Sequence, residues 1–270
     1  MLVISWVAAV VACLGYGSAS VLQSIGARRV AGATGAGGLA LILTQGTYLV
    51  GLSADAVAFL ANVVALQRLP LFLVQTIMSG SVGVTALIAT IRGTHLGRRD
   101  WLLLGVLGVG LVLVSVTATS RSAVAISSLA TWVILASTLV TAAVGLLGLR
   151  LGGRARWVTL ATAAGLGFTG VAIASRGISA DALSWALLAS PLLWTIVLQG
   201  ALALIWFAFA LQSGPVTTIT AVTFVIEMVI PGAVGLLLFG DAVRPGRGWL
   251  TAVGFALSIL GTVGLARHAE

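Results

Sequence analysis

The chain has 270 residues, of which 60% are apolar and only 7% are charged. A soluble domain of this length has about a quarter of its residues charged, so this composition excludes a water-soluble globular fold. The net charge of +8 comes from arginines placed almost entirely between apolar runs, where they contact lipid headgroups, and it therefore does not indicate nucleic-acid binding.

Nine apolar segments are each long enough to cross a bilayer as an α-helix, which takes about 20 residues. In chain order they are Leu2–Gln23, Leu39–Leu66, Pro70–Ile91, Trp101–Ala118, Ile126–Leu149, Trp157–Ala174, Leu183–Leu211, Pro215–Phe239 and Gly248–Ala266. Continuous apolar runs lack the alternation of barrel strands. The predicted fold class is therefore an all-α polytopic integral membrane protein. We expect Pro191 to kink the long seventh segment.

The arginines predict how the chain is oriented. With nine spans, one membrane face holds nine arginines, whereas the other holds Arg68, Arg121, Arg176, Arg244 and Arg247. Because positive loops favour the cytoplasm, we expect a multi-pass protein of the cell (plasma) membrane with its N-terminus outside and its C-terminus cytoplasmic. The Gly- and Ala-rich stretch Ala31–Gly38 is expected to be a flexible cytoplasmic linker.

Other residue types point to helix packing rather than to chemistry. Small residues let membrane helices approach closely, and we expect this role for Gly105, Gly108, Gly110, Gly254, Gly261 and Gly264. Cys13 is the only cysteine, and with His95 and His268 it does not make a zinc or nucleophilic site. We therefore expect neither an enzyme nor a bound cofactor.

A short motif occurs twice. Ala65–Pro70 reads ALQRLP and Ala210–Pro215 reads ALQSGP, so four of six positions agree at an offset of 145. The copies lie five predicted helices apart and therefore cross the membrane in opposite directions, as in transporters built from inverted repeats. The expected division of one membrane domain is 1–119 (first repeat, helices 1–4), 120–152 (connecting helix 5) and 153–270 (second repeat, helices 6–9). A chance match in apolar sequence is the alternative.

These motifs resemble the drug/metabolite transporter superfamily (EamA-like). The resemblance rests on Ala65–Pro70 and the helix after it, on the Arg92–Trp101 loop, and on Ala210–Pro215 followed by Leu238–Asp241, which is similar to a "hydrophobic-FGE" loop entry with Asp241 replacing Glu. The nine-helix count is closer to the NIPA-type magnesium transporter branch. The resemblance implies a secondary transporter of a small solute, either a metabolite or a cation, that works by alternating access. The chain has no lysine, so any substrate-contacting lysine of ten-helix members is absent.

Two carboxylates, Asp55 and Glu227, fall well inside predicted helices. An ionisable group at bilayer depth costs at least ~2.5 kcal/mol on insertion scales, so it usually faces a cavity or a partner and serves transport. Further polar residues complete the candidate substrate or ion site. Most of them lie at helical spacing from Asp55 or Glu227, and one lies on the third predicted helix. The full set is Glu227, Asp55, Asn62, Gln75, Thr223, Thr220 and Tyr48.

The sequence leaves several alternatives open. The carboxylates could bind a hard cation such as Mg²⁺, as a NIPA-like permease would require, or carry protons. The neutral polar residues could only hydrogen-bond helices together, and Asp55 could lie near the interface if its helix starts later. A non-transporting membrane accessory subunit is the other functional alternative. The expected partners are the lipid bilayer and a small solute or cation. A homodimer with a second copy of the chain is one expected arrangement.

Overall fold

A computed structural model describes residues 2–30, 35–91, 96–119, 127–178 and 188–268. His95, Arg121, residues 31–34 of the expected linker and the predicted start of the seventh helix at 183–187 lie outside these ranges.

Within the described ranges, nine helical segments are long and apolar enough to span a membrane, which confirms the predicted all-α polytopic fold. They are α1 (Leu2–Arg29), α3 (Gly46–Leu66), α4 with α5 (Leu71–Ser79 and Ser81–Ile91), α6 (Arg98–Thr117), α7 (Ser128–Arg150), α8 (Gly153–Gly177), α9 (Pro191–Ser213), α10 (Val216–Leu238) and α11 (Gly248–His268).

Three of the predicted helices differ in the structure. The third predicted helix in chain order, Pro70–Ile91, is interrupted at Gly80 between α4 and α5. The second segment is divided, because Gly35–Leu43 forms a separate helix α2 and Gln45 is extended before α3 begins. Gly35 to Gly38 of the expected linker are therefore helical. Pro191 does not kink a helix; it lies in the first turn of α9, where its missing N–H is not needed.

Close helix contacts form at some of the glycines expected to serve packing. A Cβ built at Gly110 of α6 would lie 2.7 Å from the carbonyl oxygen of Gly254 in α11, and one at Gly261 would lie 2.7 Å from the Cβ of Leu107. These glycines let α6 and α11 approach closely, as expected. Gly105 and Gly108 have nothing within 4 Å, so the prediction is wrong for these two.

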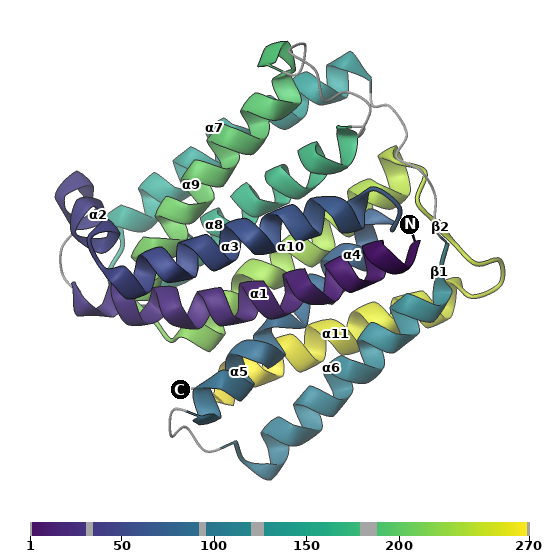
Figure 1. The fold of residues 1–270 in the computed structure, drawn as a ribbon, viewed down its shortest axis with the longest axis horizontal. Helices are drawn as coiled ribbons and strands as arrows, with labels where there is room; N and C mark the ends of the chain where they lie inside the picture. The colour runs from purple at the N-terminus through teal and green to yellow at the C-terminus, as the bar shows by residue number, and fades with distance from the viewer. Residues whose placement is uncertain (1, 31–34, 92–95, 120–126, 179–187, 269–270) are drawn as a thin grey trace.

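The helices pack in pairs (Figure 1). α1 packs against α3, α8 against α9, and α6 against α11, while α10 packs against both α8 and α4 and α7 packs against α8. A two-residue antiparallel ribbon joins β1 (Ala118–Thr119) to β2 (Ala242–Val243). We call the end of the bundle that holds this ribbon the ribbon end. The N-terminus of α1 lies there, whereas the C-terminus of α11 lies at the opposite end (Figure 1).

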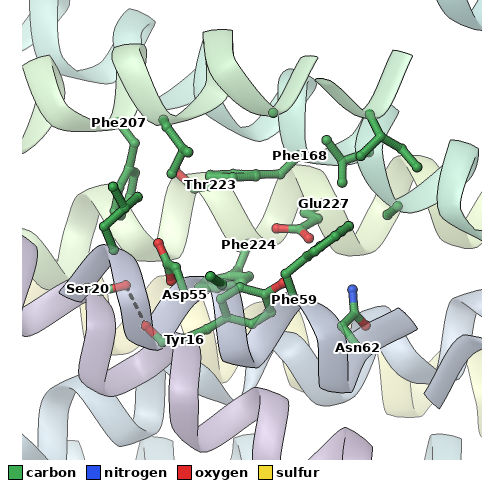
Figure 2. Close-up of a pocket in the computed structure, with 17 residues that line it drawn as sticks. Tyr16, Ser20, Asp55, Phe59, Asn62, Phe168, Phe207, Thr223, Phe224 and Glu227 are labelled. Atoms are coloured by element: carbon green, nitrogen blue, oxygen red, sulfur yellow. Dashed lines mark hydrogen bonds between the residues drawn. The ribbon is translucent and has the colours of Figure 1, made fainter. Parts of the chain in front are cut away.

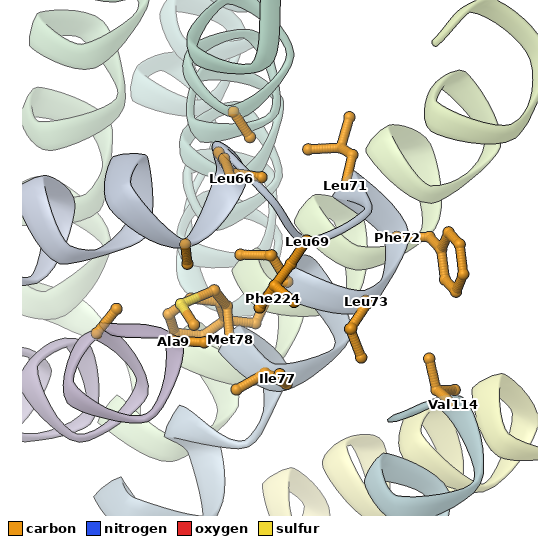
Figure 3. Close-up of a cluster of buried hydrophobic side chains, with 14 of the residues drawn as sticks. Ala9, Leu66, Leu69, Leu71, Phe72, Leu73, Ile77, Met78, Val114 and Phe224 are labelled. Atoms are coloured by element: carbon orange, nitrogen blue, oxygen red, sulfur yellow. The ribbon is translucent and has the colours of Figure 1, made fainter. Parts of the chain in front are cut away.

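The turn between α3 and α4 lies in the largest hydrophobic core (Figure 3). Leu66, Leu69, Leu71 and Phe72 of this turn are at most 1% exposed, although the turn stands at the ribbon end of two helices. Turns in membrane proteins usually reach the headgroups, so burial of this one shows that other segments cover it. The C-terminus of α8 and the connection from α10 to β2 contact it, as described below.

Candidate functional site

A cavity of about 400 Å³ opens between α1, α3, α8, α9 and α10. Asp55 of α3 and Glu227 of α10 both line it, together with the polar side chains of Ser20, Asn62 and Thr223. Figure 2 shows the two carboxylates directed into the same space from different helices. The structure thus brings together two acidic residues that lie far apart in the sequence.

Both carboxylates stand at mid-helix. Asp55 is nine residues after the start of the 21-residue helix α3, and Glu227 is eleven residues after the start of the 23-residue helix α10. At a rise of about 1.5 Å per residue, each lies some 14 to 17 Å from the end of its helix, which is near the centre of a bilayer. Although α3 starts later than predicted, this late start places Asp55 in the middle of the span.

Asp55 is held by a neighbouring helix. Gln23 of α1 donates a hydrogen bond from Nε2 to Oδ2 of Asp55 at 2.5 Å, and the Gln23 residue is fully buried. A Cβ at Gly51 would lie 2.7 Å from Cγ of Gln23, so the glycine one turn before Asp55 makes room for the amide. One oxygen of Asp55 is therefore engaged by the protein before any ligand binds.

Glu227 is less engaged. It accepts no hydrogen bond from any residue that the structure describes, although only 6% of the residue is exposed. Thr223, one turn earlier, turns its hydroxyl to the carbonyl oxygen of Ala161 in α8 at 3.3 Å and does not bond the carboxylate. The Glu227 carboxylate is consequently the acidic group that is open to a bound molecule.

The other predicted site residues lie outside this cavity. Tyr48 is 2% exposed and packs against α1, where a Cβ at Gly26 would lie 2.6 Å from its own Cβ. Gln75 of α4 and Thr220 of α10 are buried, and neither the Gln75 amide nor the Thr220 hydroxyl has a hydrogen-bond partner among the described residues. The geometry therefore restricts the candidate site to Asp55, Asn62, Thr223 and Glu227 among the predicted residues.

The aromatic wall of the cavity was not predicted from the sequence. Five aromatic residues line it: Tyr16, Phe59, Phe168, Phe207 and Phe224. The rings of Tyr16 and Phe224 are 6.2 Å apart, and those of Phe168 and Phe207 are 6.3 Å apart in an edge-to-face arrangement. Phe59 and Phe224 lie within one helical turn of Asp55 and Glu227, a spacing that could have identified these two rings from the sequence.

A second missed feature is a buried ion pair at the ribbon end. Arg176, counted from sequence among the loop arginines, is only 1% exposed at the end of α8. Its guanidinium donates to Oδ1 of Asp241 at 3.3 Å and to the carbonyl oxygen of Leu66. The N–H of Leu71 donates to Oδ2 of Asp241 at 2.6 Å. Together these bonds tie α8 and the α10–β2 connection to the buried turn between α3 and α4.

Burial affects the charge state of this carboxylate. Loss of solvent raises the pKa of the Asp241 carboxyl above its ordinary value, while Arg176 and the N–H groups of Leu71 and Phe72 act in the opposite direction. These partners therefore favour the ionised form of Asp241, against the effect of burial.

Resident metal ligands are few. The described residues contain no group of three or more His, Cys, Asp and Glu side chains that could hold a metal ion. Within the cavity, the two carboxylates of Asp55 and Glu227 are the anionic groups that could contact a cation.

Comparisons with known proteins do not add to this geometry. No family model, no curated protein and no solved structure matches the chain.

Proposed function

We propose that the protein is a secondary transporter that moves a small solute, a metabolite or a cation, across the cell membrane by alternating access. The observation that carries this proposal is the pair of mid-span carboxylates, Asp55 and Glu227, facing one cavity. Ionisable groups inside a membrane are costly and usually line a substrate or ion path. A purely structural role would favour carboxylates that are fully paired, yet Glu227 accepts no hydrogen bond from the described residues.

The positions of residues related by the sequence repeat support a division of the protein into two inverted halves. Asp55, Phe59 and Asn62 of α3 line the cavity, and the residues 145 positions later, Gly200, Leu204 and Phe207 of α9, line it as well. The helix pairs agree with this relation, because α1 packs on α3 in the first half as α8 packs on α9 in the second. A site between two inverted halves is a common arrangement in transporters that work by alternating access.

Two arginine contacts, one at each end of the bundle, are consistent with two gates. At the ribbon end, Arg176 at the end of α8 donates to the carbonyl oxygen of Leu66, in the first copy of the repeated motif. At the opposite end, Arg28 at the end of α1 donates to the carbonyl oxygen of Gly214, in the second copy, at 2.9 Å. In both contacts, therefore, an arginine of one half donates to a carbonyl oxygen in the repeated motif of the other half. We propose that these two contacts open alternately.

The orientation is part of the same proposal. We place the ribbon end and the N-terminus outside and the C-terminus in the cytoplasm, on the basis of the arginine distribution. A reporter fused after Glu270 should then read cytoplasmic. A reading on the outside would contradict the orientation while leaving the cavity and its carboxylates as described.

A Mg²⁺ permease, as in the NIPA-type branch, is the second candidate. Two carboxylates favour it, since Mg²⁺ is bound through one or two carboxylates and retained waters. The largely apolar wall around Asp55 and Glu227 disfavours it, because Mg²⁺ needs oxygen ligands. The resemblance to the drug/metabolite transporter superfamily is compatible with both candidates.

The test of transport by alternating access needs no knowledge of the solute. Gly200 lines the cavity, and a Cβ added there would meet only ordinary contact, with Cγ2 of Val171 at 3.6 Å. We would place a single cysteine at Gly200→Cys in a Cys13→Ala background and label it in oriented proteoliposomes with a membrane-impermeant maleimide. A transporter should be labelled from either face. Labelling from one face only, under all conditions, would favour a non-transporting accessory subunit.

A further inference from the structure

We infer that the solute is an organic ammonium ion carrying apolar or aromatic substituents, bound with its charge at Glu227 and Asp55 and its body against the aromatic wall. This inference rests on the proposed function, since it names the substrate class of the same cavity.

The charge of the cavity selects a cation. Asp55 and Glu227 are its ionisable acids, whereas none of the residues that line it is Arg or His. An anionic solute would meet two carboxylates and no compensating cation in a low-dielectric site, where like charges repel strongly. With a neutral solute, protons rather than the solute would have to neutralise both carboxylates. A cation satisfies the Glu227 carboxylate, which accepts no hydrogen bond from the described residues.

The wall suits an organic body. Aromatic rings attract a cation placed over their faces within about 6 Å, and the attraction grows when the site is desolvated. Tyr16 and Phe224 approach the carboxylates from α1 and α10, while Phe59 lies one helical turn from Asp55. In Figure 2 these rings lie beside Asp55 and Glu227 rather than in a separate part of the cavity. Cation and apolar body can therefore be bound together.

The supply of oxygen atoms disfavours a small metal ion. Mg²⁺ demands six oxygen ligands and gives up its waters reluctantly. Outside the carboxylates, the lining residues supply few oxygen atoms, which are the hydroxyls of Tyr16, Ser20 and Thr223 and the amide oxygen of Asn62. The hydroxyls of Ser20 and Thr223 donate to the backbone oxygens of Tyr16 and Ala161, and Oδ1 of Asn62 is buried without a partner among the described residues. A hydrated metal ion would face mostly carbon.

The two carboxylates differ in a way that fits a single positive charge. Gln23 already satisfies one oxygen of Asp55, so Glu227 is the main counter-ion and Asp55 the weaker one. The cavity volume of about 400 Å³ is near the lower end of the range of 300–1,000 Å³ for ligand pockets. A molecule with one ammonium head and one ring fits that volume.

The test uses benzyltrimethylammonium as the probe and the purified full-length chain. Its control is 2-methyl-1-phenyl-2-propanol, which has nearly the same shape but no charge. Isothermal titration should show saturable binding of the cation, with the neutral alcohol at least about tenfold weaker, because the alcohol carries no positive charge to pair with the carboxylates in a low-dielectric site. MgCl₂ at millimolar concentration should not displace the cation.

Variants locate the binding site. Glu227→Gln should weaken benzyltrimethylammonium binding about tenfold and leave the alcohol unchanged. Phe59→Leu keeps the apolar surface but removes a ring, and should weaken the cation about threefold. Asp100→Asn is the matched control, because Asp100 caps the start of α6 through the N–H of Gly97 at 2.8 Å and does not line the cavity. It should bind like the parent protein.

The outcomes separate this inference from the transport proposal. Equal binding of the alcohol, displacement by Mg²⁺, or unchanged affinity in both Glu227→Gln and Phe59→Leu overturns the organic cation. If Glu227→Gln does not fold, the probe comparison on the parent protein and Phe59→Leu still decide. Two-sided labelling of Gly200→Cys without cation binding rejects only the substrate class. Cation binding with one-sided labelling supports the substrate class and rejects transport.

Discussion

Asp241→Asn should open the ribbon end without unfolding the protein. The asparagine has nearly the shape of the aspartate, and its carbonyl oxygen can still accept the N–H of Leu71. The change removes the negative charge beside Arg176, whose side chain and that of Asp241 are both fully buried. The guanidinium keeps its bond to the carbonyl oxygen of Leu66. The closed ribbon end therefore loses one contact of a buried network while the fold keeps the rest.

The size of the effect follows from these contacts. Breaking a buried ion pair by removing one partner costs about 3–5 kcal/mol. The distance of 3.3 Å between Arg176 and Asp241 is longer than the 2.7–2.9 Å of a strong charge-assisted bond, and Arg176 retains a second acceptor. We therefore expect a smaller loss of about 2 kcal/mol. At 1.4 kcal/mol for each factor of ten, the closed state is disfavoured by about 30-fold.

Labelling of Gly200→Cys in the Cys13→Ala background measures this shift. In Asp241→Asn the rate from the ribbon face should rise by up to about 30-fold. An unchanged rate in a folded, monodisperse Asp241→Asn protein would refute the reasoning that this pair closes the ribbon end.

Two further predictions concern the cavity and the helix packing. Glu227→Gln should reduce initial uptake of benzyltrimethylammonium into proteoliposomes by about tenfold. Asp55→Asn should reduce this uptake less, because one Asp55 oxygen already accepts a hydrogen bond from Gln23. An equal or larger loss of uptake in Asp55→Asn would contradict the assigned roles. Gly261→Leu should lower the free energy of unfolding by about 1–3 kcal/mol, since its Cβ would lie 2.7 Å from another side chain. Gly105→Leu, with nothing within 4 Å, is its control in thermal unfolding, and equal melting temperatures would show that α6 and α11 do not need the close approach.

The spans and the two carboxylates could be predicted because they depend on local sequence. Twenty apolar residues specify a spanning helix, and an acidic residue in the middle of one is visible without a structure. Asp55 was found in this way even though its helix begins at Gly46, later than expected. Pro191 was misplaced because a proline in an apolar run suits the first turn of a helix as well as a kink.

The aromatic wall and the ion pair could not be found in the same way. Phe168 and Phe207 are unremarkable in sequence, since phenylalanine is common in membrane helices and only the packing of α8 on α9 turns their rings to one cavity. Arg176 stands at the end of an apolar run like any headgroup-contacting arginine. Its burial depends on Asp241, which is 65 residues away in the chain. Such contacts are tertiary and leave no periodic signal.

The contact of Arg28 gives the final prediction, because it tests whether the two ends act as one equilibrium. Arg28 is exposed and donates to Gly214 at 2.9 Å without a buried carboxylate, so its loss should cost only about 1 kcal/mol, or about fivefold. If opening one end requires closing the other, Arg28→Gln should slow labelling of Gly200→Cys from the ribbon face and speed it from the opposite face. Asp241→Asn has the reverse effect. Arg29→Gln is the control, since Arg29 is equally exposed and forms no hydrogen bond within the described residues. An increase from the ribbon face in both Arg28→Gln and Asp241→Asn would mean that the two arginine contacts only support the fold, and the reciprocal gates would be rejected.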